Sequence, residues 1–403
     1  MSQKIVIVGA GQAAAQAVAT LRAEGYAGSI TMIGDEPFEP YQRPPLSKAY
    51  LMGTFERERL FLKPDSFYRE SACRLILGVE VYAIDREEKT VSLSDGRILP
   101  YDLLLLATGT RVRLIRCPGA NLAGVHYLRS IADVDRLRPA VAKGKRLAIV
   151  GGGYIGLEVA AVAVKQGADV TVFEAMERVM ARAVSQPVSD FFEKEHRAAG
   201  VKLMLNTSVE AFEGTGRLEA VRAGNRHYPA DLVLVGIGVV PNMELAQDAG
   251  LPCEDGIVVD ENCASPADPT IFAAGDCTWH VGRDGIELRL ESVQNAIDQA
   301  KHAAYAMAGK PRAYREVPWF WSDQYDLKLQ IAGLARDIDR IVVRGNPEQR
   351  KFAVFHLREN AVVAVEAVHA PQEYLVGRKL IASGAIVAPE RLADTSIPMK
   401  SIV

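Results

Sequence analysis

The chain has few of the residues that form disulfides or bind metals. Among its 403 residues there are only five cysteines and seven histidines. The cysteines are Cys73, Cys117, Cys253, Cys263 and Cys277. An odd number of dispersed cysteines without any C-x-x-C spacing argues against a disulfide framework, and no ligand cluster suggests a zinc site. We therefore expect no metal centre.

The chain also lacks a strong net charge and long apolar runs. Its formal net charge is −3, which argues against nucleic acid as the main partner, because phosphate backbones require a basic surface. No run reaches the roughly 18 apolar residues of a membrane-spanning helix. A strand follows directly after MSQK, so we expect no cleavable leader and a cytoplasmic protein. The length predicts two or three domains.

The N-terminal segment KIVIVGAG predicts a buried strand that ends in a tight turn. Gly9 permits the turn, Gly11 leaves room for a pyrophosphate, and Ala14 lets the next helix pack closely on the strand. The N-terminus of that helix offers free amides to phosphates. The next strand, SITMIGDE, carries Asp35 where an acid binds ribose hydroxyls. Together these features predict a dinucleotide site.

The segment RLAIVGGGYIGLEVAAVAVKQGADVTVFEA repeats the whole pattern. Gly151, Gly153 and Gly156 occupy the three glycine positions, and Glu174 ends the following strand. A carboxylate there accepts from the ribose diol and repels a 2′-phosphate. The next basic residue is Arg178, so the sequence favours NADH over NADPH.

Two complete nucleotide sites in one chain are explained if one holds a permanent flavin dinucleotide and the other a nicotinamide dinucleotide that exchanges. The chemistry is then a hydride passed between the two rings. A transhydrogenase with two nicotinamide sites is the alternative.

Two further segments favour the flavin, YDLLLLATGTRVR (101–113) and TIFAAGDCTWH (270–280). With them the chain resembles the flavoproteins with two dinucleotide-binding domains, which include disulfide reductases, NADH oxidases and ferredoxin reductases. The ATG triplet is similar to the family's crossing between its FAD and NAD domains, and AAGD is similar to its second flavin motif, which ends here in Asp276. The resemblance implies an α/β fold like that of glutathione reductase, with two Rossmann-like domains and a C-terminal α+β domain.

The resemblance implies that disulfide reductases of this family would carry a C-x-x-x-x-C pair near residue 45, and peroxide-reducing relatives a single reactive cysteine. The segment PYQRPPLSKAYLMG (40–53) contains no cysteine. Dithiol exchange therefore lacks its nucleophile. The stretches RPPLSKAYL, GGGYIGLEVAA, AAGDC, ESVQNA and PWFWSDQYDLKLQIAGL resemble ferredoxin reductases that supply oxygenases. The resemblance runs from residue 4 to about 400 and is closest to reductases that serve bacterial haem-thiolate monooxygenases through a 2Fe-2S ferredoxin.

The resemblance also implies how the chain is divided and which residues bind cofactors. The expected FAD-binding domain is 1–112 and 243–319, the NAD-binding domain 113–242 and the C-terminal domain 320–403. The last should hold strands, with a turn at RENA, and then helices. The positions similar to FAD contacts are Ala13, Asp35, Arg43, Lys48, Val81, Thr108, Gly109, Arg129, Asp276 and Val293. Those assigned to NADH are Gly151, Gly153, Ile155, Gly156, Glu174 and Gly238.

Three residues are implied to act on the reaction itself. Lys48 would lie beside the reactive nitrogen of the flavin, paired with Glu158, and stabilise the charge that reduction places there. Glu158 lies in the first turn of a helix, where the helix dipole alone also favours an acid. Trp321 would lie against the flavin on the ferredoxin side, although an isolated aromatic pair is usually core. The helix near Val293 would direct its N-terminus at the pyrimidine edge of the flavin.

The expected enzyme is a monomer that takes a hydride from NADH into FAD and passes electrons singly to a ferredoxin. Such ferredoxins are usually acidic, which makes Arg312, Arg315 and Lys328 candidates for the docking surface. Three alternatives stay open: an NADH oxidase or redox-sensing flavoprotein, the reductase of a Rieske dioxygenase, and a non-enzymatic nucleotide-binding scaffold.

Overall fold

The computed structural model describes residues 3–402, which form two compact units. The first holds the described residues up to Gln42, Arg57–Arg111 and Val240–Pro318. The second holds Arg43–Glu56, Val112–Val239 and the described residues from Trp319 onward. The expected FAD-binding segments thus group together except for Arg43–Glu56 and the boundary residues Val112 and Trp319. The division of the second unit into NAD-binding and C-terminal domains stays a prediction.

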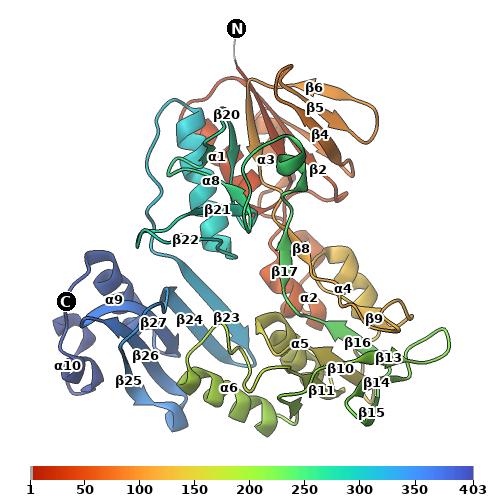
Figure 1. The fold of residues 1–403 in the computed structure, drawn as a ribbon, viewed down its shortest axis with the longest axis vertical. Helices are drawn as coiled ribbons and strands as arrows, with labels where there is room; N and C mark the ends of the chain where they lie inside the picture. Colours follow the sequence, from red (N-terminus) through yellow and green to blue (C-terminus); the bar gives the residue numbers. More distant parts are fainter. Residues whose placement is uncertain (1–2, 403) are drawn as a thin grey trace. The chain divides into compact units, whose positions relative to one another are not determined.

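The first unit is built on a six-stranded sheet whose order is β19-β20-β7-β1-β2-β3. Figure 1 labels two of its strands, β2 and β20. All neighbours pair in parallel except β19 and β20. The strands are β1 (Lys4–Val8), β2 (Ser29–Gly34), β3 (Cys73–Leu77), β7 (Leu103–Leu106), β19 (Ala264–Ser265) and β20 (Asp268–Ala273). Four consecutive residues of β1 are buried, as expected for a parallel strand covered on both faces.

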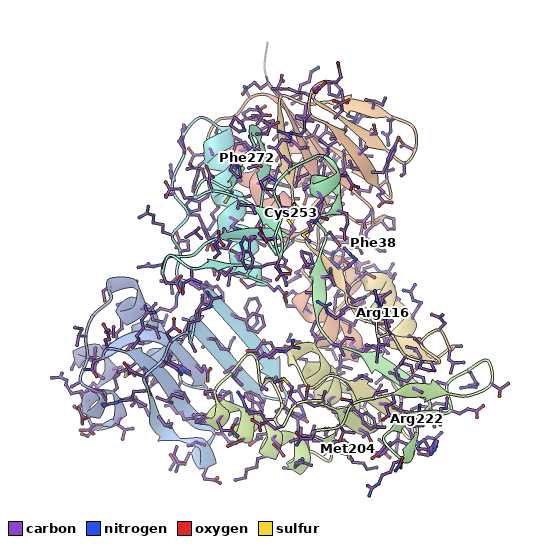
Figure 2. All side chains as sticks on the ribbon, viewed as in Figure 1. Phe38, Arg116, Met204, Arg222, Cys253 and Phe272 are labelled. Carbon is purple, nitrogen blue, oxygen red and sulfur yellow. The ribbon has the colours of Figure 1, made fainter. Side chains whose placement is uncertain are left out.

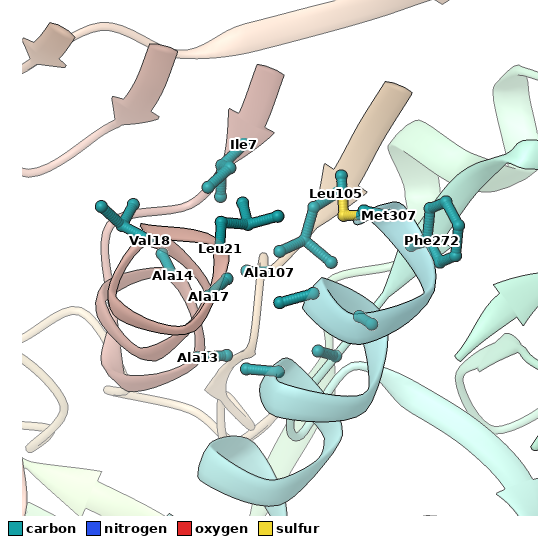
Figure 3. Packing of buried hydrophobic residues seen from close by; sticks show 14 of the residues in the cluster. Ile7, Ala13, Ala14, Ala17, Val18, Leu21, Leu105, Ala107, Phe272 and Met307 are labelled. Atoms are coloured by element: carbon teal, nitrogen blue, oxygen red, sulfur yellow. The ribbon is translucent and has the colours of Figure 1, made fainter. Parts of the chain in front are cut away.

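Two alanine-rich helices cover one face of this sheet, α1 (Gln12–Ala23) and α8 (Val293–Met307). Figure 3 shows Ala13, Ala14 and Ala17 of α1 in the same core as Leu105 and Met307. Small side chains let the two helices approach closely. The predicted strand–turn–helix at the N-terminus and the predicted start of a helix near Val293 are therefore confirmed.

Smaller elements complete the first unit. One three-stranded sheet, of order β4-β5-β6, is antiparallel, and another, of order β18-β21-β22, is mixed. Their strands are β4 (Val81–Asp85), β5 (Thr90–Leu93), β6 (Ile98–Pro100), β18 (Ile257–Val258), β21 (Thr278–Val281) and β22 (Glu287–Leu288), and the short helices are α3 (Asp65–Glu70) and α7 (Glu244–Asp248). Strands β8 (Thr110–Val112) and β17 (Val239–Pro241) lie at two of the points where the chain changes unit.

The second unit contains the second predicted strand–turn–helix, in a parallel sheet of order β12-β11-β10-β16-β9. Its strands are β9 (Val125–His126), β10 (Arg146–Val150), β11 (Asp169–Phe173), β12 (Lys202–Met204) and β16 (Leu232–Val235). Helices α5 (Tyr154–Lys165) and α6 (Gln186–Ala198) follow β10 and β11 along the chain. A three-stranded antiparallel sheet, β13 (Ala211–Glu213), β14 (Ala220–Ala223) and β15 (Arg226–Pro229), carries Arg222, labelled in Figure 2.

Residues 43–56 add two short helices to this unit, the 3-10 helix η1 (Pro44–Ser47) and α2 (Ala49–Met52). Tyr50 Oη donates to Asp135 Oδ1 at 2.8 Å, and Asp135 lies on α4 (Ile131–Leu137). This hydrogen bond is one of the contacts that join the segment to the second unit.

The C-terminal part is an antiparallel sheet of order β23-β24-β27-β26-β25. Its strands are β23 (Trp319–Gln324), β24 (Leu327–Gly333), β25 (Arg340–Asn346), β26 (Lys351–Arg358) and β27 (Ala361–Val368), followed by α9 (Pro371–Ser383) and α10 (Pro389–Ala393). Glu359 and Asn360 join β26 to β27, and both have positive φ, 53° and 63°, as a type I′ hairpin turn requires. The turn predicted at RENA is confirmed.

Candidate active site

The first glycine loop has the geometry of a phosphate cradle. Gly9 has φ +109°, and a Cβ there would lie 2.1 Å from the carbonyl oxygen of Ala107, so the turn requires glycine. Gly11 caps α1, and a Cβ there would meet no atom within 4 Å. No side chain caps this helix and its first turn contains no acid, so its amides suit an anionic group. These residues fit the pyrophosphate of a dinucleotide.

Asp35 directly follows β2 and is exposed. Its Oδ1 accepts from the amide of Glu36 at 3.0 Å, and Glu36 Oε2 accepts from Tyr41 Oη at 2.7 Å. The loop after β2 is thereby held, and the exposed carboxylate of Asp35 fits a ribose diol.

The second glycine loop repeats this geometry in the second unit. Gly151 has φ +106°, and a Cβ there would lie 2.3 Å from the carbonyl oxygen of Gly236. A Cβ on Gly156 would lie 2.2 Å from the carbonyl oxygen of Gly151, whereas one on Gly153 would meet open space. The close approaches require glycine, and the open position leaves room for a second pyrophosphate.

The carboxylate of Glu174, which follows β11, is oriented by two backbone amides. Glu174 Oε2 accepts from the amide of Gly152 at 2.7 Å, and Oε1 accepts from the amide of Met176 at 2.8 Å. The nearby guanidinium of Arg178 donates to the carbonyl oxygens of Val184 and Ala181, at 2.9 and 2.7 Å. Glu174 therefore offers a negative charge, while the guanidinium of Arg178 is already hydrogen-bonded to backbone carbonyls. This arrangement suits a ribose without a 2′-phosphate.

Lys48 and Glu158 form an ion pair although 110 residues separate them, with Lys48 Nζ 2.6 Å from Glu158 Oε2. Glu158 is 4% exposed and the side chain of Lys48 is 21% exposed. Helix α5 starts at Tyr154 and has no acid in its first turn, so the expected place of Glu158 in that turn was wrong. The same Glu158 oxygen accepts from Ser47 Oγ, and Oε1 accepts from Ser322 Oγ at 2.7 Å. Three donors thus hold one buried carboxylate, which is how a buried charge is made tolerable.

Aromatic side chains of β23 lie in the same unit. The rings of Trp319 and Trp321 are 5.6 Å apart, as expected for residues on one face of a strand. Phe320 on the opposite face lies 4.6 Å from the ring of Tyr154, the first residue of α5. Burial raises the pKa of Tyr154, and the charges of Glu366 and Glu158 raise it further, so Tyr154 stays a neutral phenol.

The remaining predicted cofactor residues of the first unit lie on segments joined by hydrogen bonds. Thr108 Oγ1 donates to the carbonyl oxygen of Asn242 at 2.7 Å, and Asn242 Nδ2 donates back to the Thr108 carbonyl at 2.9 Å. The amide of Gly275 donates to Gln299 Oε1 of α8 at 2.8 Å, which ties the AAGD motif with Asp276 to the helix that starts at Val293. Ala13 and Val81 are buried, and Gly109 has φ +61°.

In the second unit the structure brings Arg43 and Arg129 together, with Arg43 Nη1 donating to the carbonyl oxygen of Arg129 at 2.6 Å. Ile155 on α5 is exposed, and Gly238 has φ +104° with no atom within 4 Å of an added Cβ. The cofactor roles of all these residues stay predictions.

Arg129 is positioned by the capped start of α4. Ser130 Oγ accepts from the amide of Asp133 at 3.2 Å, and Asp133 Oδ2 accepts from the amides of Ser130 and Arg129 at 2.9 and 3.0 Å. Because the carboxylate of Asp133 still accepts from the two backbone amides when the hydroxyl is removed, we expect Ser130→Ala to lower the free energy of unfolding by only about 1 kcal/mol. Denaturant unfolding of both proteins measures this, and a cost above about 2 kcal/mol would contradict the capping assignment.

No cysteine is placed for dithiol chemistry, and all five are free thiols. Burial raises the pKa of Cys73 to about 12 and also raises the pKa of Cys277. Such thiols are poor nucleophiles at neutral pH. In residues 3–402 no cluster of His, Cys, Asp and Glu is arranged to hold a metal ion, and no helix there has the length and apolar character to cross a membrane.

Comparison with known proteins agrees with this geometry. Residues 3–300 match the family model described as pyridine nucleotide-disulphide oxidoreductase, and residues 319–403 match the one described as reductase C-terminal. A probable ferredoxin reductase of Castellaniella defragrans is 46% identical, covering 100% of this chain and 99% of the relative. The ferredoxin–NAD(+) reductase component of the anthranilate 1,2-dioxygenase system of Burkholderia cepacia is 42% identical, covering 99% and 98%.

Among solved structures, the crystal structure of the covalent putidaredoxin reductase–putidaredoxin complex matches with a TM-score of 0.96 at 41% identity. It covers 99% of this chain and 98% of that chain. The glycine loops, the buried ion pair and these likenesses agree, and the fold expected from the sequence is confirmed. The chain belongs to the pyridine nucleotide-disulphide oxidoreductase family, as an FAD-containing oxidoreductase that uses NADH.

Proposed function

We propose that this protein is the NADH-dependent ferredoxin reductase of an oxygenase system and that it passes electrons one at a time to a 2Fe-2S ferredoxin. The observation that carries the proposal is the buried Lys48–Glu158 pair, in a chain that has two glycine loops but no reactive cysteine near Lys48. Bound FAD supplies the connecting chemistry, because a flavin takes two electrons from NADH and can release them singly.

The chain's own residues have distinct parts in this proposal. The loop of Gly151 and Gly153 binds the NADH pyrophosphate, and Glu174 binds the adenosine ribose. Lys48 holds a positive charge where negative charge develops during reduction, which lowers the energy of the transition state. Glu158 keeps that ammonium in place, and Trp321 restricts the access of water and oxygen on the ferredoxin side.

Anaerobic stopped-flow spectroscopy tests the proposal in two mixing steps. We expect NADH to bleach the yellow protein rapidly and to produce a long-wavelength band, and an oxidised 2Fe-2S ferredoxin then to be reduced. Bleaching without transfer to any of several ferredoxins would instead support an NADH oxidase or a redox sensor. A protein that is not bleached by NADH would contradict the assignment of the second glycine loop.

The class of oxygenase is the finer part of the proposal. We favour a haem-thiolate monooxygenase, because the stretches RPPLSKAYL and PWFWSDQYDLKLQIAGL resemble reductases of those systems. The Burkholderia cepacia relative belongs by name to a dioxygenase system, so the competing partner is a Rieske dioxygenase ferredoxin. Reduction rates measured with one ferredoxin of each class discriminate between the two. The monomeric state and the cytoplasmic location stay predictions.

Docking to an acidic ferredoxin should be sensitive to salt. Among the candidate cations, the guanidinium of Arg312 lies 3.6 Å from the carboxylate of Glu24, and that of Arg315 lies 3.0 Å from the carboxylate of Glu261. The positive charge of each arginine is therefore partly neutralised. The third candidate, Lys328, lies on β24. We expect ferredoxin-dependent cytochrome reduction to fall about fivefold or more between low and high ionic strength. Reduction of the flavin by NADH, measured in the same buffers, is the control and should change little. A flat response of cytochrome reduction would contradict electrostatic docking.

A further inference from the structure

The hydrogen bonds around Glu158 continue into the C-terminal sheet. Ser322 and Gln324 lie two residues apart on β23 and share one face of it, and both are buried. Gln324 Nε2 lies 3.2 Å from Ser322 Oγ, and Gln324 Oε1 lies 2.8 Å from His196 Nε2. His196 Nδ1 in turn lies 2.8 Å from Tyr325 Oη. We call Ser322, Gln324, His196 and Tyr325 the β23 network.

The direction of every bond in this network follows from the charge of Glu158. An ionised carboxylate only accepts, so the single proton of the Ser322 hydroxyl goes to Glu158. Gln324 must therefore donate to Ser322 through Nε2, which leaves its Oε1 to accept from His196 Nε2. An imidazole that is protonated on Nε2 and neutral accepts on Nδ1, here from the hydroxyl of Tyr325.

The environment of His196 agrees with that proton arrangement. His196 on α6 is fully buried, and burial lowers its pKa to about 4. The ring is therefore neutral at physiological pH, as the donor directions require. The four hydrogen bonds of the network are therefore all donated in the same direction, from the hydroxyl of the half-buried Tyr325 toward the carboxylate of Glu158.

We propose that the β23 network is a positioning device that fixes the orientation of Glu158 and so holds the Lys48 ammonium in the place where it acts on the bound flavin. Ser322 binds Oε1, which leaves Oε2 directed at Lys48 and Ser47. Without the Ser322 donor the carboxylate can rotate about its terminal torsion, which is a soft one. The inference rests on the proposed role of Lys48 in hydride transfer, and it assigns to the C-terminal sheet a part in that reaction.

The test compares the FAD-loaded wild type with Ser322→Ala and Ser322→Thr. Ser322→Ala removes the donor, and Ser322→Thr restores a hydroxyl. In crystal structures we expect the Lys48 Nζ–Glu158 distance to lengthen beyond about 3.5 Å in Ser322→Ala only. In anaerobic stopped flow we expect flavin reduction at saturating NADH to be about tenfold slower in Ser322→Ala, and the threonine variant to recover most of the rate.

Ser189→Ala is the matched control. Ser189 on α6 is also fully buried and donates to the carbonyl oxygen of Val179 at 2.6 Å, outside the network. This variant loses a buried hydroxyl at similar structural cost, and both the ion-pair distance and the reduction rate should match the wild type.

A second variant keeps the test valid if Ser322→Ala does not fold. Gln324→Met preserves length but removes the donor to Ser322 and the acceptor for His196, and we expect a reduction rate about threefold lower with the ion pair loosened. An unchanged Lys48–Glu158 distance in the variants that fold would overturn the positioning role. A lengthened distance with an unchanged rate would leave positioning intact and contradict the role of Lys48 in the proposed function.

Discussion

Replacing Lys48 by methionine is expected to slow reduction of the flavin by NADH about a hundredfold while FAD stays bound. Methionine keeps most of the apolar stem but removes the ammonium that lies 2.6 Å from Glu158. The buried carboxylate is then left without a counter-charge, and the site loses the positive charge that opposes charge development on the flavin. Anaerobic stopped flow at saturating NADH measures the rate, and the flavin absorbance per protein measures FAD content.

The same substitution should also lower stability, because Glu158 stays buried after its partner is removed. With one fifth of the Lys48 side chain exposed, we expect a loss of about 2 kcal/mol, below that of a fully buried pair. The double variant Lys48→Met/Glu158→Gln removes the stranded charge, and its amide oxygen can accept from one of the two serine hydroxyls while its amide nitrogen donates to the other. It should regain most of the stability but none of the rate. If the flavin of the single variant Lys48→Met is reduced at the wild-type rate, the catalytic role assigned to Lys48 is wrong.

Glu174→Ala should lower kcat/KM for NADH about thirtyfold, mainly by raising KM, and reduce the preference over NADPH. The carboxylate offers two acceptors to a ribose diol and repels a 2′-phosphate, so its removal weakens binding of NADH and relieves the penalty on NADPH. Steady-state kinetics with both nucleotides and an artificial acceptor measure the change without depending on any ferredoxin.

Glu174 also accepts from the amides of Gly152 and Met176, so loss of the side chain could loosen the loop itself. Glu174→Gln separates the two effects, because it retains a hydrogen-bond acceptor for the loop and removes the charge. We expect this variant to bind NADH better than Glu174→Ala does and to accept NADPH more readily than the wild type. If both variants keep the wild-type preference between the nucleotides, the ribose assignment is wrong.

Local patterns in the sequence were sufficient for the two nucleotide-binding folds. The glycine positions, the apolar strands and the acids that end them are each set within about 30 residues of one another, a span over which chain geometry dictates the structure. The RENA turn is likewise determined locally, because a two-residue hairpin loop depends on the backbone conformations of Asn and its neighbour alone.

The β23 network was missed because its members come together only through tertiary packing. Ser322 meets Glu158 across 164 residues, and His196 meets Gln324 across 128. The tryptophans are the conspicuous residues of PWFWSDQY, but their side chains lie on one face of the strand. Ser322 and Gln324 lie on the opposite face. Two polar residues at a spacing of two on a strand were the available signal, because buried polar groups need partners. The grouping of Arg43–Glu56 with the second unit depends in the same way on contacts such as Tyr50 with Asp135.

The interleaving of the two units bears on how the protein is made in the cell. Helix α1 leaves the ribosome at the start of synthesis, whereas α8, which shares its core, is translated only after the whole parallel sheet of the second unit. At ordinary translation speeds that delay is on the order of half a minute. During this time the alanine face of α1 has no final partner and exposes apolar surface. Biosynthesis of this chain should therefore depend on protection of the nascent N-terminal segment by chaperones, and premature termination before α8 should yield insoluble product.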